Sequence, residues 1–407
     1  MIQREPAIVA RLGSIQLALH QDRARGWLLY DHRGRSVVAA RLLASHGLRS
    51  PRSLAAPAPA SARIVTEHRF FFWIPAEGLP VAIAHEDDLG ALPELPGDVV
   101  VYGTPLELRN ALEKHLPRAG IVLLEQGPFA QIADLALVDE ATLSLLRARE
   151  VSVRSSIELA NRFAGPLTAD ERAELGVTVA ALNAMLDALS ARLSAAAPSS
   201  WDEVWDVVED LAGDAGLVLD PEAGLAIEGE ARGRRALARG GGALATSAAA
   251  RLDLWASRRE GGRSVVVPAS MGLCCGSVSA GRAELEEALE ACEGELLATL
   301  EARARRGRLL GSEVAELAHD ATRQRGIELA SRCVGWPLGP VPRGSHACTF
   351  DAEGFADPRE LVPETVWGLC LAGRRGEVEV RRTCLVERTD RGLAILARGR
   401  RASVLPI

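Results

Sequence analysis

The chain of 407 residues carries a formal net charge of −7, with 48% hydrophobic and 25% charged residues. This balance excludes both a strongly basic nucleic-acid-binding surface and an acidic disordered chain. At about 100 to 200 residues per domain, the length predicts two domains. No apolar run reaches the roughly 18 to 20 residues that span a bilayer, and the start lacks a signal-peptide pattern. We therefore expect a cytoplasmic protein with neither a membrane nor a nucleic acid as partner.

The first part of the chain alternates helix and strand patterns. An amphipathic helix over "AIVARLGSIQLALHQDRA" precedes a buried strand "GWLLY" and a second helix near "SVVAARLLASHG". Strand patterns follow at "FFFWIP", "PVAIAH", "VVVYG" and "IVLLEQG", with a helix over 105–116 before the last of them. This order predicts a mixed-sheet α/β domain over residues 1–154.

After "EVSVRSSIEL" the pattern changes to long helices. Thr168, with Glu171 three residues later, has the spacing of a capping box and predicts a helix over 168–193. A second helix, a strand hairpin over 249–276, two more long helices and terminal strands complete the chain. Two blocks of paired helices and antiparallel strands predict a second domain over 155–407, with helices outside and a cavity inside.

The seven cysteines all lie between Cys274 and Cys384 and contain no C-x-x-C pair. Their odd number and their spacing predict reduced, buried side chains that act as small apolar residues. A zinc site is the alternative, although the usual ligand spacing is missing.

Five segments, taken in order along almost the whole chain, carry a resemblance to a known family. They are "GWLLYDHRG", "VRSSIELANRFAGPLTADE", "RLDLWA", "DPRELVPE" and "TCLVERTDRGLAIL". Together they resemble the creatinase, aminopeptidase P and prolidase family. The resemblance implies an α+β chain: an N-terminal creatinase-like α/β domain followed by a pita-bread domain, in a homodimer. It also implies either metal-dependent cleavage before proline or, as in creatinase, metal-free hydrolysis of a small amide.

The resemblance implies a site for two metal ions, held by two aspartates on a hairpin, one histidine and two late glutamates. Two divalent ions need several carboxylates to neutralise them. Asp253 in "RLDLWA" matches the first aspartate. The other four ligand positions correspond to Pro268, Trp336, Cys370 and Arg381. An indole is no metal ligand and a guanidinium repels cations, so we expect no metal here.

A guanidinium in this pocket would neutralise Asp253, and we expect Arg381 to pair with it. A slip of one or two residues would instead turn Arg382 or Glu379 inward. We expect three bulky aromatic side chains to pack together and fill the space that the two metal ions occupy in the resembled family. They are Trp255, Trp336 and Trp367.

Two side chains are candidates for catalysis. His346 in "VPRGSHACTFD" lies near the position of a substrate-handling histidine in the resembled family, and a surface-loop histidine is the alternative. Cys370 is a candidate nucleophile, activated by His346 or an arginine, and a strand-core cysteine is the alternative.

These observations predict a degenerate, metal-free homologue of Xaa-Pro peptidases without a cofactor. It would bind a small ligand in its cavity or act as a scaffold. A metal-independent hydrolase or lyase acting on a small amide is the second hypothesis. A Xaa-Pro metallopeptidase with relocated ligands is the third.

Overall fold

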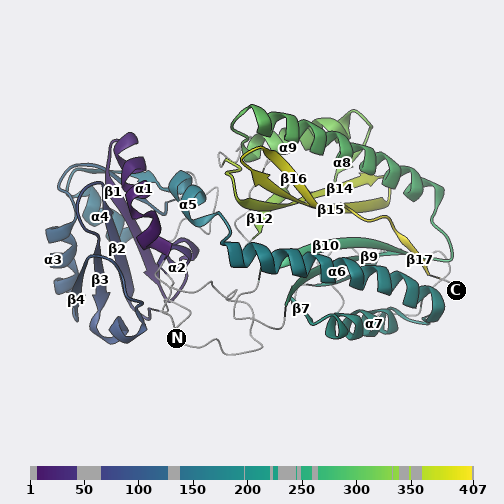
Figure 1. Cartoon of the computed structure of the whole chain (residues 1–407), viewed down its shortest axis with the longest axis horizontal. Coiled ribbons are helices and arrows are strands. Elements are labelled where there is room, and N and C mark those ends of the chain that lie inside the picture. The colour runs from purple at the N-terminus through teal and green to yellow at the C-terminus, as the bar shows by residue number, and fades with distance from the viewer. Residues whose placement is uncertain are drawn as a thin grey trace. The chain divides into compact units, whose positions relative to one another are not determined.

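The computed structural model describes residues 7–43, 66–126, 138–196, 198–220, 223–227, 244, 249–258, 265–331, 333–338, 348–349 and 360–405. These residues fall into two compact units, which divide between Pro166 and Leu167. Figure 1 shows the elements of each unit.

The first unit is built on a six-stranded sheet in the order β4-β3-β2-β1-β5-β6. The strands are β1 (Ala24–His32), β2 (Arg69–Pro75), β3 (Val81–His85), β4 (Asp98–Tyr102), β5 (Gly120–Leu124) and β6 (Val151–Ser155). The helices are α1 (Ala7–Gln21), α2 (Val37–Leu43), η2 (Glu86–Ala91), α3 (Pro105–His115), α4 (Glu140–Arg147) and α5 (Ile157–Ala164). Strand β1 is antiparallel to β2 and parallel to β5, which confirms the predicted mixed sheet.

Helix α5 belongs to the first unit, although the sequence prediction ended that domain at residue 154. Leu159 and Phe163 are buried in the same core cluster as residues of α1 and α2. Arg41 of α2 donates hydrogen bonds to the carbonyls of Ala164 and Pro166. These contacts tie the chain after β6 to the first unit, which extends to Pro166 in the structure.

The described residues of the second unit form two sheets and four helices. The helices are α6 (Ala169–Ala196), α7 (Trp201–Asp214), α8 (Ala280–Arg306) and α9 (Gly311–Arg323). The first sheet has the order β17-β10-β9-β7, with β8 paired to β9; its strands are β7 (Leu217–Leu219), β8 (Gly224–Ile227), β9 (Ala249–Arg258), β10 (Val267–Cys275) and β17 (Ser403–Leu405). The second has the order β13-β12-β14-β15-β16, with β11 paired to β14; its strands are β11 (Glu328–Leu329), β12 (Cys333–Leu338), β13 (Cys348–Thr349), β14 (Thr365–Arg375), β15 (Val378–Thr389) and β16 (Gly392–Ala397).

Each helix pair covers one sheet, as the two predicted blocks required. Helices α6 and α7 pack against strands of the first sheet, and α8 and α9 pack against the second (Figure 1). The predicted capping box at the start of α6 is present: the Glu171 backbone N–H donates to Thr168 Oγ1 at 3.2 Å, and the Thr168 N–H donates to Glu171 Oε2 at 2.8 Å.

Helix α6 is long and apolar enough, over Ala169–Ala195, to cross a membrane by length and composition alone. The sequence patterns did not single out such a segment. Leu175, Leu182 and Leu189 of α6 are buried in the core shared with α7 and the first sheet. Packing inside the unit buries 39% of this apolar window, so part of the apolar surface has a partner there.

Five cysteines have described side chains, and all five are buried and form no disulfide: Cys274, Cys275, Cys292, Cys370 and Cys384. The side chains of Cys333 and Cys348 lie outside the described part of the chain. For these five residues, the predicted role as small buried side chains is confirmed.

Candidate functional site

Side chains of β9 alternate between two environments. Leu252 and Leu254 are fully buried in the core formed with α6 and α7, whereas Asp253 points to the opposite side and is partly exposed. The antiparallel pairing with β10 places Pro268 across from Trp255, so both lie on the Asp253 side. We call the side of the two sheets that turns away from the helices the inner face.

The second sheet contributes to the same inner face through β14 and β15. Cys370 pairs in register with Thr383, and the Thr383 hydroxyl lies 2.9 Å from that of Ser270 on β10. The inner faces of the two sheets therefore contact each other. A close approach occurs at Gly368, where an added Cβ would lie 2.9 Å from Trp336 Nε1 and 3.3 Å from Pro268 Cγ.

The five residues that the sequence assigned to metal-ligand positions all lie on the inner face, and they form two groups. Pro268 and Trp336 lie beside Gly368, and the Trp336 ring packs against Trp255 with the centroids 5.2 Å apart. The other three interact electrostatically with one another; they are Asp253, Cys370 and Arg381.

Trp367 was predicted to join the aromatic group, and that prediction is wrong. Its side chain is 1% exposed in the core beneath α8 and α9, on the opposite side of β14 from Gly368. Its indole N–H donates to Thr365 Oγ1 at 2.7 Å. Strand alternation explains the error, because consecutive residues of β14 face opposite sides.

Asp253 is bound by two guanidinium groups. Its Oδ2 lies 2.8 Å from Arg251 Nε and 3.5 Å from Arg381 Nη1, so the pair expected from the sequence is present. Arg251 also binds Glu379, with Nη1 2.7 Å from Oε1, and Arg374 Nη2 lies 2.7 Å from Glu379 Oε2. Among the described residues, three guanidinium groups and two carboxylates thus form one ion-pair network.

The charges of this network favour the ionised form of Glu379. Burial alone would raise the pKa of Glu379, but the hydrogen bond from Arg374 and the charges of Arg251 and Arg381 outweigh it and lower the pKa. Glu379 is therefore held on the inner face as an ionised partner of arginine.

The register of β15 settles which residues face inward. Arg382 points to the helix side, where its side chain is 3% exposed and its Nε lies 2.8 Å from Glu293 Oε2 of α8. Glu379, two positions before Arg381, shares the inner face with it. Of the two alternatives left open by the sequence, Arg382 is excluded, and Glu379 faces inward together with Arg381 instead of replacing it.

A dinuclear metal centre does not fit this donor set. Such a centre needs several carboxylates around two divalent ions. Here Asp253 is held between Arg251 and Arg381, and a cation bound to it would lie next to both guanidinium groups. The other positions that the sequence comparison assigned to metal ligands present a proline, an indole and a buried thiol.

Cys370 is 4% exposed, and burial raises the pKa of its thiol, although the charges of Arg381 and Arg251 and a hydrogen bond with Thr383 oppose this. A nucleophilic cysteine needs the reverse, a lowered pKa and access to substrate. The structure therefore favours the strand-core alternative for Cys370. His346, the other catalytic candidate, lies outside the described residues.

The folded protein is expected to protect Cys370 from iodoacetamide. The thiol is neutral at pH 7.5 and has almost no access to solvent, so alkylation should be at least tenfold slower than for the urea-unfolded chain. Mass spectrometry of the peptide that contains Cys370 measures the difference. Rapid labelling of the native protein would instead reveal a reactive thiol.

Sequence reasoning missed two members of the ion-pair network, Arg251 and Arg374. A signal for Arg251 was available, because in "ARLDLWA" it lies two residues before Asp253 and strand alternation puts both on one face. No local signal identified Arg374, which reaches the network through Glu379 across the turn between β14 and β15.

No protein-family model and no curated protein matches the sequence, but solved structures match the fold. Dipeptidase PepE from Mycobacterium ulcerans is 15% identical, with a TM-score of 0.68 and 98% of each chain covered. The Xaa-Pro dipeptidase from Bacillus anthracis is 12% identical, with a TM-score of 0.61 over 98% of this chain and all of the other. The chain has the two-domain pita-bread fold of these dipeptidases. The fold implied by the sequence resemblance is thereby confirmed.

The same pita-bread fold also occurs outside proteins named as peptidases. The N-terminal domain of the FACT complex subunit SPT16 from Eremothecium gossypii is 12% identical to this chain, with a TM-score of 0.58 over 98% of this chain and 99% of that one. The similarity to all three structures shows the fold alone. Any activity of this chain has to be argued from the residues on its inner face.

Proposed function

We propose that this pita-bread chain is not a Xaa-Pro peptidase and acts as a binding or scaffold protein. The observation that carries the proposal is the position of Asp253 between Arg251 and Arg381. The one carboxylate retained at a metal-ligand position already has guanidinium partners, which supply the positive charge that a metal pair would supply in a peptidase. Without that metal pair, none of the groups described on the inner face is suited to activate water for peptide hydrolysis.

The fold itself is compatible with this proposal. Structures of the same architecture are named both as dipeptidases and as a domain of a complex subunit. A chain that keeps the fold without the metal chemistry can therefore retain an interaction role. Function must then be argued from the residues on its faces rather than from the fold.

The inner face also bears on the second hypothesis, metal-free hydrolysis of a small amide. That reaction needs a general base or nucleophile with access to substrate. The Cys370 thiol is buried with a raised pKa, and Asp253 is engaged by two arginines. These features support a binding role over a hydrolytic one.

The proposal predicts that the purified protein does not cleave Xaa-Pro dipeptides with Mn²⁺, Co²⁺ or Zn²⁺ present. Asp253→Asn is the matched variant, because it removes the only acid at a metal-ligand position and leaves the side-chain volume unchanged. It should leave the amount of bound metal within error of the unchanged protein, as measured by elemental analysis after dialysis. Cleavage before proline, or metal lost on Asp253→Asn, would contradict the proposal and restore the relocated-ligand peptidase.

A further inference from the structure

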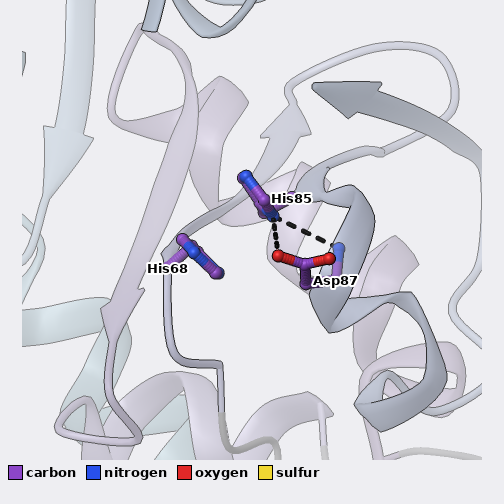
Figure 2. A group of neighbouring side chains, drawn as sticks. All are labelled: His68, His85 and Asp87. Atoms are coloured by element: carbon purple, nitrogen blue, oxygen red, sulfur yellow. Dashed lines mark hydrogen bonds and ion pairs between the residues drawn. The ribbon is translucent and has the colours of Figure 1, made fainter. Parts of the chain in front are cut away.

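A group of potential metal ligands lies in the first unit, apart from the inner face. His68 immediately precedes β2, and His85 is the last residue of β3. These strands are antiparallel, with Phe71 opposite Ile83, so the start of β2 lies beside the end of β3. Asp87 follows in the first turn of η2. Figure 2 shows the three side chains converging from these elements.

We propose that His68, His85 and Asp87 bind one divalent transition-metal ion of the zinc type. Each side chain offers one ligand atom, and the three atoms lie within 4.8 Å of one another. Asp87 Oδ2 is 3.4 Å from His85 Nδ1. Two imidazoles and a carboxylate suit Zn²⁺, Co²⁺, Ni²⁺ or Fe²⁺ and are unsuited to Mg²⁺ or Ca²⁺, which take oxygen ligands.

A histidine that binds a metal through one ring nitrogen usually donates its other ring N–H to a carboxylate, and the neighbouring Asp88 is placed to accept it from His68. Its side chain is 5% exposed and accepts the backbone N–H groups of Glu67 and His68, each at 3.0 Å. One of its oxygens lies 3.3 Å from His68 Nδ1, a buried ring nitrogen that lacks the alignment of a hydrogen bond. A small rotation of the ring would align Nδ1–H with Asp88 and fix Nε2 as the ligand nitrogen.

The ring of the second histidine, His85, is positioned by contacts with neighbouring residues. The His85 ring packs edge-on against Tyr102 with the centroids 5.2 Å apart, and the Tyr102 hydroxyl donates to the Arg69 carbonyl at 2.6 Å. His85 Nδ1 accepts the Asp87 backbone N–H at 3.2 Å, and an ion bound at Nδ1 would have to displace this hydrogen bond. The end of β3 therefore orients His85, while His68, which is 41% exposed, has room to move.

Metal binding requires the two imidazole rings to tilt apart. The rings of His68 and His85 are stacked, with centroids 3.7 Å apart and planes 13° from parallel. Zinc binds nitrogen in the plane of the ring at about 2.1 Å, which puts two tetrahedral ligand atoms about 3.4 Å apart. Rotation of the exposed His68 ring toward Asp88 would open the stack, and the three candidate ligand atoms already lie within 4.8 Å of one another.

The charge of the site also favours a divalent cation. Asp87 and Asp88 place two carboxyl groups next to the ring pair, and Asp87 is 71% exposed. A bound dication would be attracted by both carboxyl groups.

Cobalt titration of the full-length protein tests the site, because Co²⁺ reports its ligands through its visible absorption bands. We expect one Co²⁺ per chain, with a band typical of four- or five-coordinate nitrogen and oxygen ligands, and displacement by Zn²⁺. His68→Ala and Asp87→Asn change exposed side chains and should each weaken Co²⁺ binding at least tenfold. Circular dichroism verifies that both variants fold.

Two control variants separate this site from other cation-binding groups. His20→Ala removes another histidine of the same unit, whose Nε2 lies 3.6 Å from Glu77 Oε1 and which belongs to no three-ligand group among the described residues. It should leave the titration unchanged. Asp253→Asn on the inner face should also leave it unchanged, so this inference and the proposed function can fail separately. Absence of the Co²⁺ band, or an equal affinity in folded His68→Ala and the unchanged protein, would overturn the assignment.

Discussion

Replacement of Arg382 by alanine is expected to lower the free energy of unfolding by about 3 to 5 kcal/mol. The side chains of Arg382 and Glu293 are 3% and 2% exposed, and their ion pair measures 2.8 Å. Arg382 Nη2 also donates to the Gly399 carbonyl at 2.7 Å, and the Gly399 N–H donates to Glu293 at 3.3 Å. Loss of the guanidinium leaves a buried carboxylate without its charged partner. Urea unfolding followed by circular dichroism measures the change.

The neighbouring Arg381→Ala is the matched control for this prediction. Arg381 is 28% exposed, and its partner Asp253 keeps the closer Arg251, so the loss should stay near or below about 1 kcal/mol. The double variant Arg382→Met with Glu293→Leu should recover most of the stability, because it leaves no buried charge unpaired. An equal loss in Arg381→Ala and Arg382→Ala would show that burial of the pair does not determine its effect.

Ionisation of Glu125 is expected to destabilise the first unit as the pH rises from about 5 to 8. Glu125 follows β5 and is 1% exposed. Burial raises the pKa of its carboxyl to about 8, although the Ser36 hydroxyl donates to it at 2.7 Å. In the unfolded chain the same group ionises near 4.5, so between these values the folded state binds more protons. Stability is therefore highest below the unfolded pKa and declines until the pH passes about 8.

The size of this effect follows from the pKa difference. At about 1.4 kcal/mol per pKa unit, the difference corresponds to roughly 4 to 5 kcal/mol as an upper bound. Glu125→Gln keeps the side-chain shape without the charge and should remove the part of the decline that Glu125 causes, while the neighbouring buried Asp31, whose pKa burial also raises, keeps its own contribution. Amide hydrogen exchange of β1 and β5 at pH 5, 7 and 9 measures the opening free energy of this unit.

Glu77→Gln serves as the control for the pH experiment. Glu77 is 84% exposed in the same unit, so its replacement should leave the pH dependence as it is. If Glu125→Gln and the unchanged protein lose stability in parallel between pH 5 and pH 8, the carboxyl of Glu125 is not the group responsible.

Much of the fold was available from the sequence, because helix and strand periodicity are local properties. The capping box at Thr168, the β9–β10 hairpin and the mixed first sheet follow from spacing and alternation. The order of the five resembling segments indicated the pita-bread fold. Alternation along β9 also suffices to put Asp253 and Arg251 on one face of that strand.

The tertiary structure decided what lies across from these residues. Arg251 and Glu379 are 128 positions apart, and only the packing of two sheets brings them within 2.7 Å. Likewise, the pairing register of β15 sends Arg381 inward and Arg382 to the helix side, since a slip of one residue reverses the facing. Helix α5 joined the first unit because of its buried contacts with α1 and α2. Sequence periodicity determined which residues share an element and a face, whereas charge pairing and domain membership depend on long-range packing, which no local pattern encodes.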